Sequence, residues 1–351
     1  NMANISLSGT TVNFSNWSNY SSNGGGRWGG PGGMQEGNSF IELHGHDAIF
    51  GKGLVMQNFK NCQVVCSARA ASMMCQFFDF DFSDRILQVK EGDKLELGKH
   101  TLTFYAAPMV HWPEVIVTYE STEKVLFSAD GFGKFGALCN ETDDWACEAR
   151  RYYFNICGKY GSPVQTLLKK AATLDIQTIC PLHGPILKEN LGYYLGLYDT
   201  WSKYEPETKG VFIAYATLHG NTGKAAKELA EMLEAKGVKV AISDLSRADV
   251  AECVEDAFRY DRMVLAASTY DGGLMPLMKD FLGHLSDKTY QNRKVALVEN
   301  GSWAPAAARI MRSTVETFKN VSIIDKVVTI KTTLNENTRN DLKELANLLA
   351  E

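Results

Sequence analysis

Apolar runs of strand length alternate with amphipathic, helix-like segments through the C-terminal part of the chain. Ala225, Ala226, Leu229 and Leu233, for example, have the spacing of one helix face. Strands that alternate with helices form a doubly wound parallel sheet, whose ligands bind at the carboxyl ends of the strands. We therefore predict an α/β domain over residues 210–351 with a five-stranded parallel sheet. Its predicted strands lie at 211–215, 238–242, 262–267, 294–298 and 323–330.

The N-terminal part of the chain combines short strands with polar turns. Its predicted strands lie at 63–66, 101–105, 115–119 and 124–128, and its predicted helices lie at 152–174 and 193–201. This mixture predicts a second α/β domain over residues 51–204, joined to the C-terminal domain by a linker around Pro206. Residues 1–50 form an atypical segment rich in Gly, Ser and Asn, a composition that buries little surface.

Composition limits the possible partners. With 351 residues the chain is long enough for two domains, and its net charge of −5 without a basic block argues against binding to nucleic acid. No apolar run approaches the roughly 20 residues of a membrane span, and no signal-peptide pattern is present. The eight cysteines form no C-x-x-C pair, which is typical of reduced thiols in the cytosol. We expect a cytoplasmic protein that binds neither nucleic acid nor a membrane.

The loop after the first strand of the C-terminal domain has the composition of an anion site. It runs from Thr217 to Thr222 with the sequence TLHGNT and opens onto a predicted helix. Free backbone N–H groups and the helix dipole attract an anion there, and the two threonines add hydroxyl donors. The loop has neither the P-loop nor the G-x-G-x-x-G pattern. It suits the terminal phosphate of FMN.

Two further loops follow strands of the same predicted sheet. Residues 268–273 follow the third strand, and residues 300–303 follow the fourth. A flat flavin ring packs against aromatic faces, and Tyr270 and Trp303 offer such faces. We therefore predict an FMN site formed by three strand ends. Its predicted residues are Thr217, His219, Gly220, Asn221, Thr222, Thr269, Tyr270, Asp271, Gly272, Asn300, Gly301, Ser302 and Trp303.

Three motifs in the N-terminal domain have the order and spacing of a known family. They are HWPE at 111–114, FSADGFG at 127–133 and PLHGP at 181–185. On these motifs, from about Leu54 onward, the chain resembles the flavodiiron proteins, in which a metallo-β-lactamase-like domain precedes a flavodoxin-like one. The family's segments supply a His, a bridging Asp and a second His to a non-haem di-iron site, a donor set that suits iron. The resemblance implies that the metal ligands and catalytic residues are His111, Asp130 and His183.

The first ligand motif of the family, His-x-Glu-x-Asp-His, is missing from this chain. Its flanking residues recur at 1–10, but Met2, Asn4, Ser6 and Leu7 stand at the ligand positions. A second partial counterpart lies nearer the expected distance from the next strand, and its candidate ligands are His44, His46 and Asp47. The family's first strands are also absent, so the resemblance implies a truncated or rebuilt αββα domain. Two metals, one metal or none remain open on this pattern.

The resemblance implies an FMN-dependent oxidoreductase that reduces O2 to water or nitric oxide to nitrous oxide. Electrons would pass from an external donor, such as rubredoxin or a flavin reductase, through FMN to two non-haem irons per subunit. The family also implies a head-to-tail homodimer. An alternative is a flavodoxin-like electron carrier whose lactamase-like domain is vestigial and metal-free. A hydrolase of the lactamase type is disfavoured, because its H-x-H-x-D-H cluster is broken at Ala48.

Overall fold

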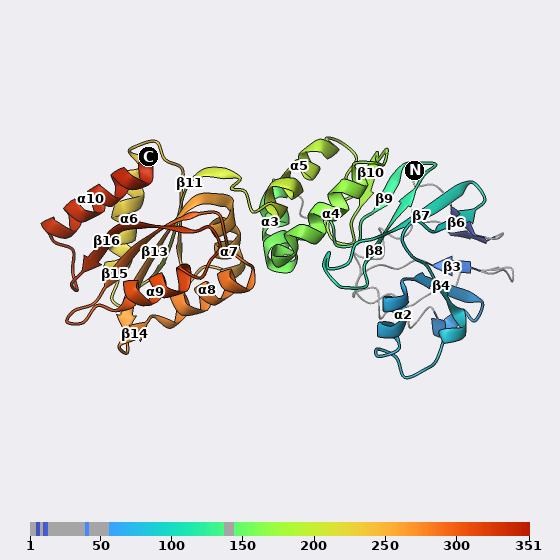
Figure 1. Ribbon diagram of the computed structural model, residues 1–351, viewed down its shortest axis with the longest axis horizontal. Helices are drawn as coiled ribbons and strands as arrows, with labels where there is room; N and C mark the ends of the chain where they lie inside the picture. Colours follow the sequence, from blue (N-terminus) through green and yellow to red (C-terminus); the bar gives the residue numbers. More distant parts are fainter. Residues whose placement is uncertain (1–4, 8–9, 13–38, 42–55, 137–143) are drawn as a thin grey trace. The chain divides into compact units, whose positions relative to one another are not determined.

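The structure, a computed structural model, groups the chain into two compact units (Figure 1). The residues that it describes are 5–7, 10–12, 39–41, 56–136 and 144–351. Unit 1 comprises Asn1–Gly133, Ala137–Asn140 and Thr166–Tyr194, and unit 2 comprises Lys134–Gly136, Glu141–Gln165 and Leu195–Glu351. Segments that precede residue 204 thus belong to the same unit as the C-terminal sheet. The bounds expected for the three sequence regions, 1–50, 51–204 and 210–351, remain predictions.

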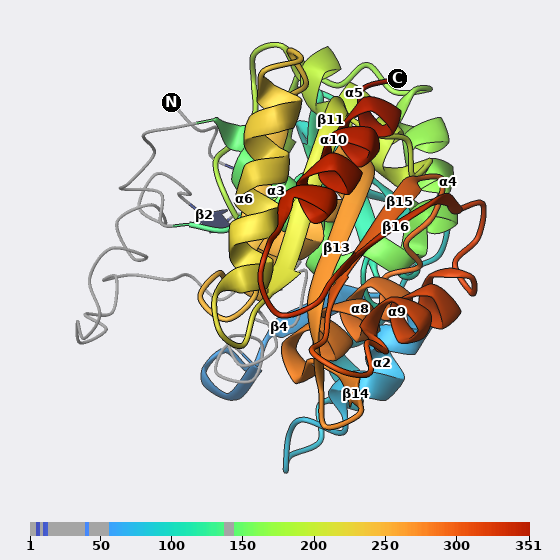
Figure 2. The same cartoon turned by 90° about the vertical axis from the view of Figure 1, so that its left-hand side faces the viewer.

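Unit 2 is built on a sheet of five parallel strands in the spatial order β12, β11, β13, β15, β16. Figure 2 shows β11, β13, β15 and β16 of this sheet. In the spatial order, the bounds of the five strands are Val240–Asp244, Thr208–Ala216, Tyr260–Tyr270, Lys294–Asn300 and Ser322–Ile330. By position in the chain this order is 2-1-3-4-5, which is that of flavodoxin-like sheets. A short strand, β14 (Gly273–Leu274), pairs antiparallel with the end of β13. The predicted five-stranded parallel sheet is confirmed.

Helices cover both faces of this sheet. They are α6 (Asn221–Glu234), α7 (Val250–Arg259), α8 (Pro276–Asp287), α9 (Ala307–Val315) and α10 (Glu336–Ala350). In β11, Val211 and Ile213 belong to the core beneath α6 and α10, whereas the ring of Phe212 lies 6.4 Å from that of Phe281 in α8. Because helices bury both faces of the sheet, its strands have continuous apolar sequences rather than alternating apolar and polar residues.

The predicted helix over residues 152–174 is broken in the structure. The elements there are α3 (Trp145–Ile156), a 3-10 turn (Gly158–Tyr160) and α4 (Gly161–Ala171). The helix α3 begins earlier than predicted, because the carboxylate of Asp144 caps its N-terminus. A Cβ on Gly161 would lie 2.3 Å from the carbonyl oxygen of Ser202, the last residue of α5 (Leu191–Ser202). This close approach requires glycine where the two helices meet.

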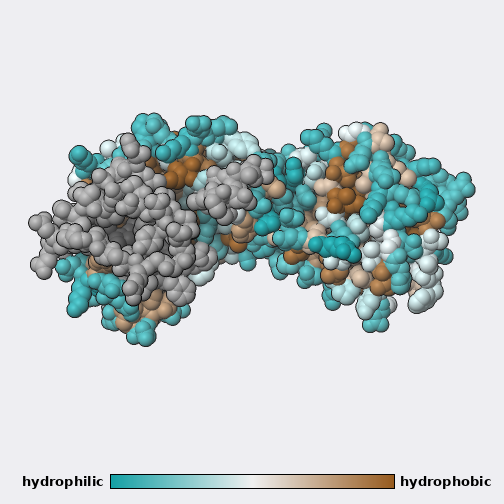
Figure 3. Space-filling view, turned by 180° about the vertical axis from the view of Figure 1, so that it is seen from behind, coloured by the Kyte–Doolittle hydropathy of each residue, from teal (hydrophilic) through white to brown (hydrophobic). Residues whose placement is uncertain are grey.

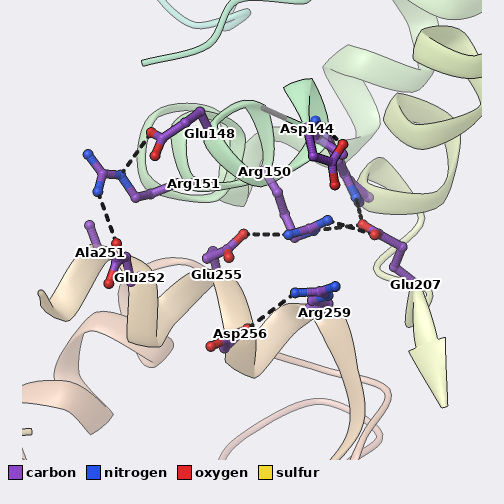
Figure 4. Close-up of polar contacts among 12 residues, drawn as sticks. Asp144, Glu148, Arg150, Arg151, Glu207, Ala251, Glu252, Glu255, Asp256 and Arg259 are labelled. Carbon is purple, nitrogen blue, oxygen red and sulfur yellow. Dashed lines mark hydrogen bonds and ion pairs between the residues drawn. The ribbon is translucent and has the colours of Figure 1, made fainter. Parts of the chain in front are cut away.

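A buried arginine links α3 to α7 and to the start of β11 (Figure 4). Arg150, which is 1% exposed, donates to the two carboxylate oxygens of Glu207 at 2.7 and 2.6 Å and to Glu255 at 2.8 Å. Glu207 also accepts a hydrogen bond from the indole N–H of Trp201 at 2.9 Å. One guanidinium group therefore joins three elements of unit 2 by charge-assisted hydrogen bonds.

The buried carboxyl of Glu255 predicts a pH-dependent stability. Burial raises its pKa from 4.5 to about 7, against the opposing effect of Arg150. A carboxyl whose pKa rises on folding contributes most stability below its unfolded pKa, and that contribution is lost as the pH rises to the folded value. Between about pH 4.5 and pH 7.5, the wild-type protein should therefore lose about 3 kcal/mol of stability relative to a Glu255→Gln variant, as measured by urea unfolding.

A matched control is available on the same helix. Glu252 is 58% exposed in its side chain, so Glu252→Gln should leave the pH dependence of unfolding close to that of the wild type. Asp256 also has a pKa raised by burial, but it is present in all three proteins and its effect cancels in the comparison. Equal pH slopes in the wild type and in Glu255→Gln would contradict the prediction.

Unit 1 contains two larger β-sheets, and one apolar cluster includes side chains from both of them. A mixed sheet has the order β10, β9, β8, β7, β6, and a parallel sheet has the order β3, β4, β5. The bounds are β10 (Thr178–Cys180), β9 (Val125–Phe127), β8 (Ile116–Glu120), β7 (His100–Ala106), β6 (Lys94–Leu97), β3 (Ser39–Ile41), β4 (Cys62–Cys66) and β5 (Ile86–Gln88). Val65 of β4 packs with Leu102, Phe104 and Ile116 of the mixed sheet. The strands predicted in this part of the chain are confirmed at closely similar bounds.

The described part of unit 1 also contains smaller elements. The helix α2 (Ala68–Met74) packs on the parallel sheet through Ala71 and Met74, next to the 3-10 turn η2 (Ser83–Arg85). The strands β1 (Ile5–Leu7) and β2 (Thr10–Val12) form an antiparallel pair. Layers of helix on sheet and sheet on sheet give this unit its core.

On the face of unit 2 that Figure 3 shows, polar residues predominate and apolar residues form separate small groups. Among the described large apolar side chains that are exposed, Trp303 is the most exposed, at 92%. None of the helices in the described ranges combines the length and the apolar content that crossing a membrane requires. The exposed tryptophan lies in one of the loops predicted to bind FMN.

Candidate functional site

Three loops of unit 1 meet at one edge of its mixed sheet. The strands β7 and β9 run in the same direction because each is antiparallel to β8, and β10 is parallel to β9. The carboxyl ends of these three strands therefore share an edge. The loops that follow them carry His111, Asp130 and His183.

The three side chains converge on the carboxylate of Asp130. Nε2 of His111 lies 3.8 Å from Oδ2, and Nε2 of His183 lies 3.5 Å from Oδ1. The side chain of Asp130 is 2% exposed, compared with 15% for His111 and 32% for His183. A buried carboxylate thus turns one oxygen toward each of two partly exposed imidazoles. The structure brings the three predicted ligands together, while their role as ligands stays a prediction.

This donor set fits metal ions that share a carboxylate. Zinc binds imidazole nitrogen and carboxylate oxygen at about 2.0–2.2 Å, and iron accepts the same donors, so two atoms on one ion lie within about 4.4 Å of each other. Both N–O distances meet that limit, each with a different oxygen of Asp130. Within the described residues, no three His, Cys, Asp or Glu side chains are grouped to hold a metal ion. The three residues therefore offer two pairs of donors rather than one complete ligand set.

The other candidate ligands are not described by the structure. His44, His46 and Asp47 lie outside the described residues, and so do Met2 and Asn4 of the alternative segment. Nothing in the geometry of the site therefore decides between the two partial counterparts of the missing motif. The completion of the ligand set stays a prediction.

The predicted phosphate loop of unit 2 presents open donors. Gly220, with φ of 84°, is the N-cap of α6, and no side chain of the described residues caps this end. Thr217 Oγ1 is buried and has no hydrogen-bond partner in the described part of the chain. Thr222 is fully buried, and its hydroxyl bonds with Ser268 Oγ at 2.9 Å. An anion here would meet free N–H groups and the Thr217 hydroxyl, as a phosphate site requires.

The other two predicted FMN loops follow the neighbouring strands β13 and β15. Tyr270 is 46% exposed and Trp303 is 92% exposed, so both rings can contact a flat ligand. Asp271 and Gly272 have φ of 49° and 69°, and these left-handed residues turn the chain back into β14. The aromatic residues of the predicted site therefore lie at the carboxyl edge of the sheet, Tyr270 as the last residue of β13 and Trp303 in the loop after β15.

Three predicted FMN residues already bond to the loop that follows the neighbouring strand. Thr269 Oγ1 accepts the N–H of Ala306 at 2.9 Å. The side chain of Asn300 donates to the carbonyl of Thr332 and accepts its N–H, both at 3.1 Å, and Ser302 bonds with the Thr332 hydroxyl at 2.7 Å. Thr332 was missed by sequence reasoning, although the polar run after the fifth predicted strand was a usable signal. These side chains shape the loops, and their contact with FMN stays a prediction.

Two protein-family models match the chain in the order of its predicted domains. The ODP family beta lactamase model matches residues 46–184, and a flavodoxin domain model matches residues 212–346. Together the two models account for most of the chain. They confirm the predicted fold, a metallo-β-lactamase-like domain followed by a flavodoxin-like one.

Relatives and solved structures agree with the two models. An uncharacterized protein of Methanocaldococcus jannaschii is 28% identical over 77% of this chain and 70% of its own length, and a nitric oxide reductase of Moorella thermoacetica is 28% identical over 76% and 68%. The rubredoxin oxygen:oxidoreductase of Desulfovibrio gigas has the same fold, with a TM-score of 0.78 and 22% identity over 89% of this chain and 80% of that chain. The flavodiiron protein of Giardia intestinalis gives a TM-score of 0.77 and 22% identity over 84% and 76%. With the motifs around His111, Asp130 and His183, these findings confirm the predicted resemblance of the chain to the flavodiiron proteins.

Proposed function

We propose that this protein is an FMN-dependent oxidoreductase that passes electrons from an external donor through FMN to non-haem iron, where O2 or nitric oxide is reduced. The observation that carries the proposal is the convergence of His111, Asp130 and His183 in a chain that also has a flavodoxin-like sheet. A relative at 28% identity is named a nitric oxide reductase. A flavodoxin domain and the resemblance to the flavodiiron proteins imply FMN and non-haem iron as cofactors.

In this proposal the carboxyl edge of the parallel sheet holds FMN, which supplies electron transfer when bound. The N-terminus of α6 and the hydroxyl of Thr217 would bind the phosphate, since their donors are open. Tyr270 and Trp303 would pack against the ring, and their exposure leaves aromatic surface free for that contact. Thr269 and Asn300 fix the loops that carry these two rings.

The other half of the proposal concerns the edge of the mixed sheet. His111 and His183 would each hold an iron ion, Asp130 would join the two ions, and the bound iron supplies the redox site for a small gas. The negative charge of Asp130 offsets part of the charge of the ions, and its burial limits competition from water for the two oxygens. The partial exposure of both imidazoles leaves a path from solvent to this side of the site.

Assembly, electron donor and location form the outer part of the proposal. We extend it to a head-to-tail homodimer in the cytoplasm that accepts electrons from rubredoxin or a flavin reductase. A solved structure with the same fold is named rubredoxin oxygen:oxidoreductase, which supports rubredoxin as the first donor to test. In such a dimer, the sheet edge that binds FMN in one subunit and the sheet edge that binds metal in the other would belong to the same assembly.

A second candidate function is that of a flavodoxin-like electron carrier with a metal-free lactamase-like domain. One observation favours it: within the described ranges, no group of three or more ligand-type side chains can hold a metal ion. The carrier would use the open phosphate loop and the exposed aromatic rings in the same way. The two candidates therefore differ in iron content and share the FMN site.

Metal and FMN content of protein purified after iron supplementation distinguishes the two functions. We expect about two iron ions per FMN, together with consumption of O2 or nitric oxide by the chemically reduced protein. Iron near zero with FMN near one per chain would overturn the reductase and support the carrier. Elemental analysis measures iron, and absorbance after release of the flavin measures FMN.

A further inference from the structure

The turn that carries Asp130 is closed by hydrogen bonds between its own residues. The Ser128 hydroxyl donates to the carbonyl of Gly131 at 2.7 Å, and the N–H of Gly131 donates back to the carbonyl of Ser128 at 2.9 Å. The N–H of Gly133 donates to the carbonyl of Asp130 at 3.2 Å. Ser128 is fully buried, so water does not replace its hydroxyl as a partner. The side chain of Ser128 thus spans the turn from one end to the other.

The backbone of this turn adopts conformations that need such support. Ala129 has φ of 52° and Phe132 has φ of 66°, and both lie in the left-handed region, which L residues with a Cβ rarely occupy. Residues of this kind persist where the surrounding structure fixes them. Ala129 lies between Ser128 and Asp130, so it is part of the turn that the hydrogen bond from the Ser128 hydroxyl to the Gly131 carbonyl closes.

The same turn is bonded to the loop that carries His183. The N–H of Ser128 donates to the carbonyl of Cys180 at 3.1 Å, and the N–H of Leu182 donates to the carbonyl of Ala129 at 2.9 Å. The first bond is made to Cys180, the last residue of β10, and the second is made by Leu182 in the loop that follows β10. A change in the turn would therefore move Asp130 relative to His183, which lies next to Leu182.

We infer that Ser128 is a positioning residue, which sets the Asp130 carboxylate so that one oxygen faces His111 and the other faces His183. This inference rests on the proposed metal site. A carboxylate that bridges two ions must hold both oxygens in place, and side chains that orient a ligand typically change metal affinity 10- to 100-fold. The hydroxyl of Ser128 contacts the carbonyl of Gly131, the residue directly after Asp130, and acts through the shape of the turn.

A structural role alone would predict a different result. Ser202 in unit 2 makes a comparable bond, because its hydroxyl is buried and donates to the carbonyl of Tyr198 at 2.5 Å. Replacing either serine with alanine removes one buried hydroxyl and the bond that it donates, and at Ser202 it also removes the bond accepted from Gln165 at 2.8 Å. Both variants should lose stability, and the positioning role adds a loss of metal affinity for Ser128→Ala alone.

The test is a Co2+ titration of the metal-stripped, FMN-loaded protein, with the visible ligand-field spectrum as the readout. Against the wild type, Ser128→Ala should bind Co2+ 10- to 100-fold more weakly with a shifted spectrum. Ser128→Thr, which keeps the hydroxyl, should restore affinity, and Ser202→Ala should bind like the wild type. If the alanine variant does not fold, Ser128→Cys replaces it, because a thiol of similar size is a weaker donor.

Each result has a distinct meaning. Wild-type affinity and spectrum in Ser128→Ala, or an equal loss in Ser202→Ala, would overturn the positioning role while leaving the metal site intact. Failure of the wild type to bind Co2+ would overturn the proposed metal site and the inference with it, with FMN content still testing the flavin half. An unrestored affinity in a folded Ser128→Thr variant would also count against the hydroxyl as the group that matters.

Discussion

Replacement of Asp130 by asparagine is expected to remove iron from the protein and to abolish the reduction of O2 and nitric oxide. Asp130 turns a separate oxygen toward each of two imidazoles, whereas asparagine has one oxygen and no charge. Two cations beside His111 and His183 would lose the anion between them, and their mutual repulsion would be less offset. We expect about a 100-fold or greater loss of Fe2+ affinity and reductase activity near background.

FMN provides the internal reference for this prediction. The predicted FMN loops lie in unit 2, so the FMN content of Asp130→Asn and the reduction of its flavin by the donor should be unchanged. Asp84→Asn is the matched control, because it makes the same chemical change at an exposed position of unit 1. Full iron content together with wild-type gas reduction in Asp130→Asn would show that the reaction does not use this site.

The flavodoxin-like sheet could be predicted from sequence because its signal is local. Strands buried on both faces produce continuous apolar runs, and β11 and β15 appear as such runs at 211–215 and 294–298. The helix α6 was found for a similar reason, since its apolar residues repeat along one face. Burial and periodicity both act within a single element, so one sequence is enough to show them.

The break between α3 and α4 has a local signal, because Gly158, Gly161 and Pro163 are poor helix formers inside the predicted helix over 152–174. What could not be predicted is the close approach of Gly161 to the carbonyl of Ser202, which lies in another helix. The burial of Arg150 could not be predicted for a similar reason, because its carboxylate partners are 57 and 105 residues away and a charged residue in a helical pattern normally indicates a solvent-exposed face. Long-range contacts of this kind leave no periodic signal around the residue itself.

The candidate site was predicted by two different routes. The FMN loops followed from physical reasoning, because a parallel sheet binds ligands at the carboxyl ends of its strands. His111, Asp130 and His183 followed from family motifs, and no periodicity indicated that a carboxylate would face both imidazoles. The role of Thr332 depends on two loops meeting at the sheet edge, so it became evident only in the structure.

Removal of the Arg150 side-chain charge is expected to produce the largest loss of stability in unit 2. In an Arg150→Met variant, Glu207 and Glu255 would lose a guanidinium that now donates to them at 2.6–2.8 Å. The guanidinium of Arg259 pairs with Asp256 at 3.9 Å, and the bond between Arg259 and Glu207 is a backbone one, in which the N–H of Glu207 donates to the Arg259 carbonyl at 3.0 Å. Breaking a buried ionic cluster by removing one partner typically costs about 3–5 kcal/mol, because a buried charge is left uncompensated. Urea unfolding of the whole protein measures this loss.

A matched substitution of the neighbouring residue Arg151 distinguishes the effect of losing a buried charge from the effect of losing a charge at the surface. Arg151 pairs with Glu148, Asp249 and Glu252 at the surface, so Arg151→Met should cost about 1 kcal/mol or less. The double variant Arg150→Met with Glu255→Gln removes a charge on each side, and it should be more stable than Arg150→Met alone. A single variant as stable as the wild type, or a double variant less stable than the single one, would contradict the buried-charge explanation. In the second of these outcomes, the cost of Arg150→Met would lie in packing against Trp201, whose ring centroid lies 6.0 Å from the guanidinium carbon, rather than in the ionic cluster.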